Sequence, residues 1–377
     1  MPADADPAVT LLHNYREIQQ PSMRLYAERL GEALIRQGVR VTRVRPPRLV
    51  PTPWRNRSWL WQKIDDYGGE HIVYPRLLGR RDQGVVHVID HSQGYLIAGL
   101  NPRRTIVSSH DTTVLTLAMG RIGGAKVPHV AVQMFRISLE FAKRAAAIVA
   151  DSQQSRRDLA SMAGIDPEKV RVIHPGLNQA FAPDRERGAR LRDKLGLGSG
   201  LLMFQIGRTF YKNIRGVLRV LNTLRRGGLN VRLVRSGPSL TGPDRALAER
   251  LNLLPEVVEL GALPDADIPA LYNAVDLLLF PSSYEGFGWP PLEAMASGTP
   301  VVCSRAGSLD EVVGDAALTA DPEDIEMLGW HAASVLTDAK VRNELVRRGL
   351  EHAARFSWQR AAMEMRSVYR EVAARAA

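Results

Sequence analysis

The chain has 377 residues, 45% hydrophobic and 24% charged, which suits two domains with substantial cores and excludes a disordered protein. Its apolar runs fall far short of the roughly 20 residues that a membrane span needs, and its acidic start, MPADADPAVT, predicts no signal peptide. The net charge is +10, and residues 1–180 hold most of the excess, with 25 Lys and Arg against 16 Asp and Glu.

Short apolar runs alternate with amphipathic segments along the chain. Residues 8–15 predict a strand, residues 22–38 a helix that ends at Gly38, and residues 39–44 a strand. Such alternation predicts parallel sheets with right-handed crossovers. Further strands are expected at 85–90, 104–110, 145–152, 201–207, 230–237, 257–261, 275–280 and 299–304, and helices at 213–228 and 356–377.

The alternation pauses over residues 174–200, where glycine, proline and dense charge indicate a linker. We therefore predict an α/β protein with two doubly wound, Rossmann-like domains, residues 1–178 and 179–356, followed by a helix at 357–377 that packs back on the first domain. Ligands bind at the carboxyl ends of parallel strands, so the site is expected in a cleft between the domains. The single cysteine, Cys303, follows two valines and is expected to be a buried strand residue in a reducing cytoplasm.

Two polar clusters stand at expected strand ends. In VSSHD, His110 ends a strand of the first domain. In IGRTFYKNI, Gly207 follows a strand, and Asn213 can cap the next helix. Between them, Arg208 and Lys212 are four residues apart and would neutralise a diphosphate at a helix N-terminus. A structural histidine and a pair of surface cations are the alternatives.

Residues 282–298, SSYEGFGWPPLEAMASG, follow another expected strand. Their glycines allow backbone amides to approach a ligand. Pro290 and Pro291 suit the first turn of a helix, which would place Glu293 in that turn. Glu285 would reach the same place from the loop. A carboxylate can accept hydrogen bonds from both hydroxyls of a vicinal diol, as in ribose or a hexose. The alternative is that Glu293 only caps the helix.

Together these clusters resemble the retaining glycosyltransferases of family 4, which have the GT-B fold of two Rossmann-like domains facing a central cleft. The resemblance covers nearly the whole chain. It rests on residues 282–318, close to the family signature with its two glutamates, and on residues 145–183, similar to the interdomain passage. IGRTFYKN and SSHD match further elements of the family.

The resemblance implies that the second domain binds the nucleotide sugar. Glu293 would bind the ribose hydroxyls, and Glu285 would contact the transferred sugar. The backbone amides of Gly286, Phe287 and Gly288 would lie beside that sugar.

The resemblance also implies the catalytic groups. Arg208 and Lys212, next to Gly207, would hold the diphosphate and stabilise it as the leaving group. His110 would lie near the reacting sugar. The leaving phosphate would help to deprotonate the acceptor, and the anomeric configuration would be retained. Neither a cofactor nor a metal is expected, and no His or Cys spacing fits zinc.

The implied reaction moves a hexose of mannose or glucose type from a nucleotide-diphosphate sugar to a lipid-linked or envelope glycan acceptor. GDP-mannose is slightly favoured as the donor over a UDP-hexose. In the family the acceptor belongs to the N-terminal half, which is here the basic one. A basic half favours an anionic partner, so peripheral contact with an anionic membrane at the inner face of the plasma membrane is expected. A solvated basic surface is the alternative.

Other functions remain open from the sequence. A GT-B epimerase or phosphorylase is the alternative enzyme class, although no cofactor lysine or phosphate site stands out. A nucleic-acid-binding protein would explain the pI of about 10.0, but no known binding motif accompanies the charge. An NAD-dependent oxidoreductase is weaker still, because no G-x-G-x-x-G follows the first strand.

Two stretches are less easily assigned. The family often has a glycine pair in its first loop, whereas residues 16–26, REIQQPSMRLY, have none. The role of that loop is therefore not carried over. Residues 46–63 place Trp54, Trp59 and Trp61 among cations, which suits a membrane interface or a sugar platform. A loop whose tryptophans pack on the core is the alternative.

Overall fold

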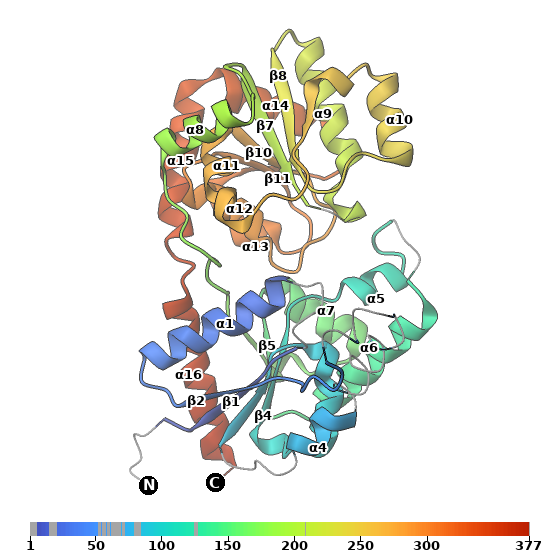
Figure 1. The fold of residues 1–377 in the computed structure, drawn as a ribbon, viewed down its shortest axis with the longest axis vertical. Coiled ribbons are helices and arrows are strands. Elements are labelled where there is room, and N and C mark those ends of the chain that lie inside the picture. The colour runs from blue at the N-terminus through green and yellow to red at the C-terminus, as the bar shows by residue number, and fades with distance from the viewer. Residues whose placement is uncertain are drawn as a thin grey trace. The chain divides into compact units, whose positions relative to one another are not determined.

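The structure is a computed structural model, and its elements form two compact units, each around its own parallel sheet (Figure 1). Unit 1 comprises Met1–Ala118, Val127–Asn178 and Ser357–Ala377, and unit 2 comprises Met119–Lys126 and Gln179–Phe356. The residues that the structure describes are 6–14, 21–51, 54, 58, 61, 69, 72–78, 84–123, 127–207 and 209–376.

The sheet of unit 1 has the strand order β2-β1-β3-β4-β5-β6, and all neighbouring strands pair in parallel. The strands are β1 (Val9–Leu12), β2 (Val41–Val44), β3 (Val85–Val88), β4 (Thr105–Ser109), β5 (Ala147–Ala150) and β6 (Val170–Val172). Strands β3, β4 and β5 are buried along their whole length, as a parallel sheet covered on both faces requires. The sequence does not predict β6, because three residues show no strand period.

Helices of unit 1 come from both ends of the chain. They are α1 (Pro21–Arg36), α4 (Tyr74–Leu78), α5 (Thr113–Ala118), α6 (His129–Ala142), α7 (Gln153–Ala163) and α16 (Trp358–Arg375), with short 3-10 helices η2 (His91–Gly99), η3 (Pro102–Arg104) and η4 (Pro167–Lys169). Helix α16 packs against α1. Its Trp358 donates through Nε1 to the Leu177 carbonyl at 2.9 Å, and the hydroxyl of Tyr369 lies 2.8 Å from His87 Nδ1 beneath it.

The sheet of unit 2 has the order β12-β11-β10-β7-β8-β9 and is also parallel throughout. The strands are β7 (Leu201–Ile206), β8 (Val231–Ser236), β9 (Val257–Glu259), β10 (Leu277–Phe280), β11 (Val301–Ser304) and β12 (Leu318–Ala320). Cys303 lies in β11 and is fully buried, which confirms its predicted environment. The predicted α/β class with two doubly wound sheets is confirmed.

Helices cover both faces of this second sheet. They are α8 (Arg185–Lys194), α9 (Ile214–Arg226), α10 (Gly242–Arg250), α11 (Ile268–Ala274), α12 (Trp289–Ala296), α13 (Leu309–Val313), α14 (Ile325–Thr337) and α15 (Ala339–Ala353), with 3-10 helices η5 (Phe210–Lys212), η6 (Leu254–Glu256), η7 (Asp265–Asp267) and η8 (Gly314–Ala316). Helix α9 confirms the helix expected at 213–228. Its Val217, Leu218 and Leu221 are buried and form part of one core with residues of α14. Among the described helices, none is both long and apolar enough to span a bilayer.

The linker expected over residues 174–200 is wrong in its central part, because α8 lies there. Asp184 begins this helix by accepting a hydrogen bond from the Arg187 amide at 2.9 Å. Leu191 is buried, and α8 packs against α11. The helix is so rich in charge that only one or two positions face the core, and its sequence therefore shows almost no helical period.

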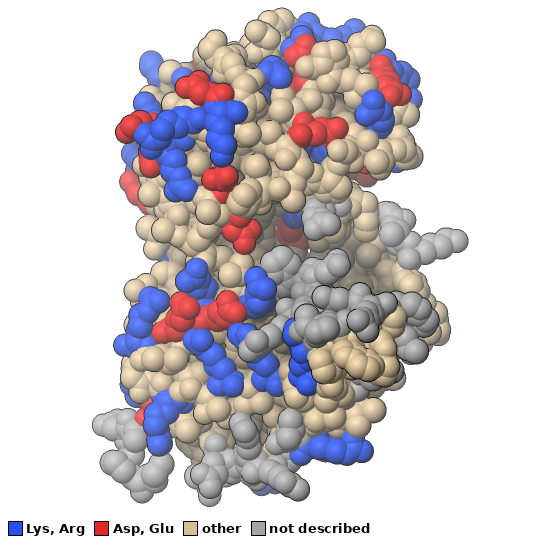
Figure 2. Space-filling view, in the orientation of Figure 1, with Lys and Arg blue, Asp and Glu red and all other residues tan. Residues whose placement is uncertain are grey.

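Basic and acidic side chains are interspersed around α1 on the face drawn in Figure 2. Glu32 lies 3.2 Å from Arg29 and 3.5 Å from Arg36, and Glu28 lies 3.1 Å from Arg45. Such exposed pairs add little to stability, but they neutralise part of the local positive charge. The basic excess of the N-terminal half is therefore broken up near α1.

Tyr369→Phe should destabilise unit 1 by about 1–3 kcal/mol, because it leaves His87 Nδ1 buried without its partner. Chemical denaturation measures the change. Met363→Ala, on an exposed position of the same helix, is the control and should leave the unfolding midpoint in place. A Tyr369→Phe midpoint equal to that of the parent protein would contradict the importance of this contact.

Candidate active site

The chain reverses its progress across the sheet of unit 2 between β7 and β10. From β7 it proceeds through β8 to β9 at one edge, and from β10 through β11 to β12 at the other. Strands β7 and β10 are neighbours, and the chain continues from them toward opposite edges of the sheet. Open α/β sheets bind ligands at such a point, beside the loops that follow the two strands. Gly207 and Lys212 follow β7, and residues 281–288 follow β10.

Lys212 and Glu285 form a nearly buried ion pair at this point. Lys212 Nζ lies 2.6 Å from Glu285 Oε1, and the two side chains are only 12% and 9% exposed. The same ammonium stands 4.5 Å from the centre of the Phe280 ring. Gly207 has a φ of +128°, and a Cβ there would lie 2.8 Å from Lys212 Cγ. The glycine thus makes room for the lysine stem, and the pair holds a poorly hydrated cation beside a carboxylate.

Backbone contacts fix the loop that carries Glu285. The Ser308 hydroxyl donates to the carbonyl oxygens of Glu285 at 3.1 Å and Phe287 at 2.8 Å. Gly307 has a φ of +63°, and a Cβ there would lie 2.5 Å from the Glu285 carbonyl oxygen. Sequence reasoning missed Gly307 and Ser308. Their signal was the AGS stretch directly after a predicted strand, at the same sheet edge.

The loops after β7 and β10 are also joined to each other. The Ser283 amide donates to the Tyr211 carbonyl at 2.8 Å. Asn213 follows with a φ of 52° and caps α9, as predicted, by accepting from the Gly216 amide at 3.0 Å. Its Nδ2 donates to the Pro322 carbonyl at 2.9 Å. Lys212 is therefore held between a cross-loop hydrogen bond and a helix cap.

The prediction for the start of α12 was correct in part. The two prolines lie in its first turn, and Gly288 is the N-cap with a φ of 96°. Because the helix begins at Trp289, Glu293 is its fifth residue. The expectation that Glu293 lies in the first turn is wrong, since the helix starts one residue before the prolines, and Glu293 does not cap it.

Glu293 instead reaches a tyrosine of the neighbouring helix. The Tyr272 hydroxyl of α11 donates to Glu293 Oε2 at 2.9 Å. Burial raises the pKa of Glu293 to about 7, although the hydrogen bond from Tyr272 and the charge of Lys212 act in the opposite direction. The Glu293 carboxyl group is therefore close enough to Lys212 for the ammonium charge to lower its pKa. Sequence reasoning also missed Tyr272, because its role depends on a contact between two helices.

Three of the predicted features lie wholly or partly outside the described residues. Arg208 and Trp59 are not described, nor is the first-loop segment 15–20. The rings of Trp54 and Trp61 lie 6.1 Å apart, edge to face, and the residues are 54% and 38% exposed. These two tryptophans therefore pack against each other rather than in the core.

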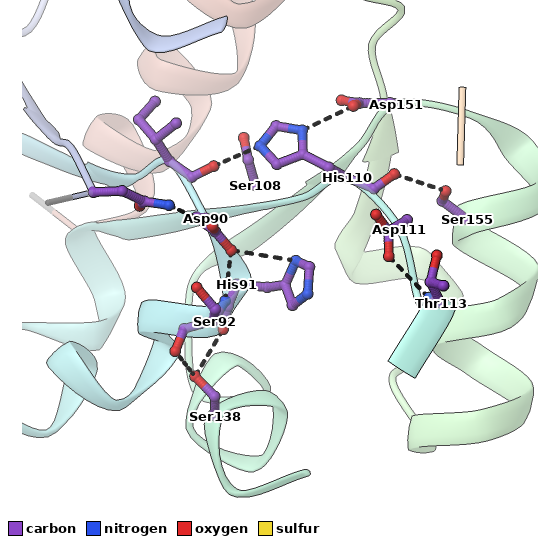
Figure 3. Close-up of polar contacts among 12 residues, drawn as sticks. Asp90, His91, Ser92, Ser108, His110, Asp111, Thr113, Ser138, Asp151 and Ser155 are labelled. Atoms are coloured by element: carbon purple, nitrogen blue, oxygen red, sulfur yellow. Dashed lines mark hydrogen bonds and ion pairs between the residues drawn. The ribbon is translucent and has the colours of Figure 1, made fainter. Parts of the chain in front are cut away.

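His110 belongs to unit 1, where it directly follows β4, and both of its ring nitrogens are occupied (Figure 3). Nδ1 lies 2.8 Å from Asp151 Oδ2, and Nε2 lies 2.7 Å from the Ile89 carbonyl oxygen. Both partners accept hydrogen bonds, so both nitrogens donate and the ring is an imidazolium. Burial alone would lower the pKa of His110, but Asp151 outweighs it and raises the pKa to about 9. The predicted contact of His110 with a sugar stays a prediction.

More charged groups gather at the ends of β3, β4 and β5 (Figure 3). Asp90 accepts from the Ser92 amide at 2.8 Å and lies 3.8 Å from His91 Nδ1. Asp111 accepts from the Thr113 amide at 2.8 Å, at the start of α5. Sequence reasoning missed Asp90, His91 and Asp151, although Asp90 and Asp151 lie at the ends of predicted strands, as His110 does, and His91 directly follows one. Among the described residues, no three His, Cys, Asp or Glu side chains are arranged to hold a metal ion.

Family models match both halves of the chain. The model described as glycosyltransferase family 4 matches residues 23–181, and the model described as glycosyl transferases group 1 matches residues 189–352. The chain belongs to glycosyltransferase family 4. The resemblance found in the sequence is thereby confirmed. In this family member most of the first match lies in unit 1, and the second match lies in unit 2.

Curated relatives of this family 4 chain include two kinds of enzyme. O-antigen chain mannosyltransferase B from Escherichia coli is 41% identical over 162 residues, which are 42% of each chain. A D-inositol 3-phosphate glycosyltransferase from Salinispora arenicola is 34% identical over 247 residues, or 60% of this chain and 55% of the relative. The chain spans about half the length of the curated relatives it matches.

Solved structures agree with the fold. The sucrose-phosphate synthase of Thermosynechococcus elongatus has a TM-score of 0.72 at 19% identity, covering 98% of this chain and 99% of that one. Anabaena Alr3699/HepE, solved in complex with UDP and glucose, has a TM-score of 0.71 at 18% identity, covering 96% and 99%. The family 4 chain therefore has the predicted GT-B fold.

Asp151→Asn should destabilise unit 1 by about 3–5 kcal/mol near neutral pH, because the buried imidazolium of His110 loses its counter-charge. The pKa of His110 is raised from 6.5 to about 9 on folding, so the parent pair stabilises fully below about pH 6.5 and loses its effect as the pH rises through about 9. Thermal unfolding across this pH range measures both effects.

The control for Asp151→Asn is Glu168→Gln, whose side chain is 87% exposed in the same unit. It should unfold as the parent protein does. An Asp151→Asn protein that keeps the parental melting temperature and alkaline profile would rule out the imidazolium.

Proposed function

We propose that this chain is a retaining glycosyltransferase that moves a hexose from a nucleotide-diphosphate sugar to a lipid-linked or envelope glycan acceptor. The observation that carries the proposal is the nearly buried Lys212–Glu285 pair at the reversal point of unit 2, in a chain of glycosyltransferase family 4. The pair offers a cation to a diphosphate and carboxylate oxygens to sugar hydroxyls.

In the proposed reaction, the bond between the anomeric carbon and the distal phosphate oxygen breaks, and its electron pair stays on that oxygen. The acceptor hydroxyl oxygen forms the new bond to the same carbon, on the face that the phosphate leaves. Its proton passes to the departing phosphate, and a nucleoside diphosphate is released. Departure and attack on one face retain the configuration without a protein nucleophile or a metal.

The cationic and the acidic residues have different roles in the proposed reaction. Lys212, and Arg208 by family resemblance, stabilise the negative charge that develops on the leaving phosphate. Glu285, released in part from Lys212, accepts hydrogen bonds from the transferred sugar. Glu293 binds the ribose. The amides of residues 286–288 line the sugar, since their loop is fixed by the Ser308 hydroxyl.

Two donors are supported by different comparisons. The similarity to O-antigen chain mannosyltransferase B favours mannose as the transferred sugar, and the family resemblance slightly favours GDP-mannose as its donor. The shared fold with a protein solved with UDP and glucose keeps a UDP-hexose open. For the acceptor side, the exposed Trp54 and Trp61 support peripheral contact with a membrane surface or a glycan.

The proposal is tested by ligand binding and product analysis. One of GDP, UDP and ADP should raise the melting temperature, because a ligand that binds the folded state stabilises it. The matching sugar nucleotide, with a lipid-linked oligosaccharide as acceptor, should give a glycoside of retained configuration by NMR. Consumption of the sugar nucleotide without acceptor would favour an epimerase, and an inverted product would exclude the mechanism.

Lys212→Ala should lower kcat by about 10²–10³-fold, because the leaving phosphate loses a preorganised cation. Initial rates of sugar transfer at saturating donor measure this effect. Lys194→Ala, an exposed lysine of α8 in the same unit, is the matched control and should keep the parental kcat. Parental turnover by Lys212→Ala would remove this residue from the mechanism.

A further inference from the structure

Tyr272 is held rigidly inside unit 2. It is fully buried, and its ring lies edge to face with Phe204 at 5.5 Å and with Phe181 at 5.9 Å between centres. Its carbonyl oxygen accepts from the Thr299 hydroxyl at 2.7 Å. Contacts from β7 and from the segment before α8 therefore fix the ring, and a contact from the segment before β11 fixes its backbone. The direction in which its hydroxyl points is set by the core and not by solvent.

Among the described residues, that hydroxyl has one hydrogen-bond partner. It donates to Glu293 Oε2 at 2.9 Å, and burial raises the pKa of Tyr272 well above its usual value, so the proton stays on the phenol. Within the part of the chain that the structure describes, Tyr272 is the one side chain found to hydrogen-bond the Glu293 carboxyl. Glu293 as a whole residue is half-buried. Since each carboxylate oxygen offers two acceptor positions, Oε1 and one position on Oε2 are left for a ligand.

We propose that Tyr272 is a positioning residue for the donor nucleotide, whose hydroxyl fixes Glu293 Oε2 so that the carboxylate presents its remaining acceptor positions to the ribose diol. The inference rests on the proposed function, because it takes the ligand of Glu293 to be a ribose. Without the tyrosine hydroxyl, the ligand would have to order the carboxylate, and the entropy cost of that ordering would weaken binding.

The same contact couples ribose binding to pH. The groups that act on the Glu293 carboxyl are Tyr272 on α11, Lys212 in η5 and Asp265 in η7. The carboxylate, the stronger acceptor, dominates above about pH 7, so affinity for the diol should fall as the pH drops through that value. Loss of the Tyr272 hydroxyl removes a donor to the charged form, which raises the pKa further and moves the fall to higher pH.

The experiment compares GDP and UDP with their 2′,3′-dideoxy forms by titration calorimetry, on the full chain. Tyr272→Phe should weaken the ribonucleotide that binds by about 3- to 30-fold. The dideoxy form should bind the variant and the parent within about 2-fold, since it lacks the hydroxyls that Glu293 would receive. The midpoint of the pH profile for the ribonucleotide should also move upward in Tyr272→Phe.

Tyr369→Phe is the matched control. It removes the hydroxyl of another fully buried tyrosine, in unit 1, and should leave the preference for ribose over dideoxyribose unchanged. Equal weakening of both nucleotide forms in Tyr272→Phe would indicate a merely structural tyrosine and overturn the proposal. Unchanged ribonucleotide affinity would overturn it as well. If the parent protein binds no nucleotide, the proposed function itself fails.

Glu293→Gln keeps the test decisive if Tyr272→Phe does not fold. Its ribonucleotide affinity should be independent of pH, whereas the parent affinity should fall below about pH 7. A flat profile in the parent contradicts the proposal. Where the variants fold, Glu293→Ala, which keeps no side-chain acceptor for the tyrosine, should bind no more strongly than its double variant with Tyr272→Phe. An additional loss would show that Tyr272 acts through another group.

Discussion

The contact between Lys212 and Glu285 is the constraint around which the site of unit 2 is built. Removing a cation and a carboxylate from water is costly unless they meet with good geometry, so the loops after β7 and β10 must stay together. The Ser283–Tyr211 hydrogen bond joins them, and the Ser308 hydroxyl anchors the carbonyls around Glu285. An anionic ligand at Lys212 replaces one counter-charge by another, so it can enter without leaving the cation unpaired.

The two units use charge at their strand ends in different ways. In unit 1, His110 and Asp151 neutralise each other, and the second ring nitrogen of His110 donates to the Ile89 carbonyl (Figure 3). This arrangement ties β3, β4 and β5 together at their carboxyl ends. In unit 2, the described residues hold Glu293 at one oxygen, which leaves it acceptor capacity. The strand ends of unit 1 are therefore held rigidly, whereas Glu293 in unit 2 can still accept hydrogen bonds from a ligand.

Sequence reasoning found the architecture because strand and helix periods are local properties, clear in runs such as residues 201–206 and 214–226. It failed at β6, which is too short to show a period, and at α8, whose charge hides it. The residues of the site were found where a motif marked them. Tyr272, Ser308 and Asp151 were missed, because each acts on a partner 20 or more residues away that only the fold brings near.

Unit 1 is built from both ends of the described chain, with Tyr369 of α16 against His87 of β3. During synthesis on the ribosome, β3 emerges long before α16, and the whole of Gln179–Phe356 is made in between. The sheet of unit 1 therefore lacks α16 on one of its faces until all of Gln179–Phe356 has been synthesised. The N-terminal domain, which usually folds first, thus lacks one of its helices until unit 2 has been made. The last helix then closes the earlier half.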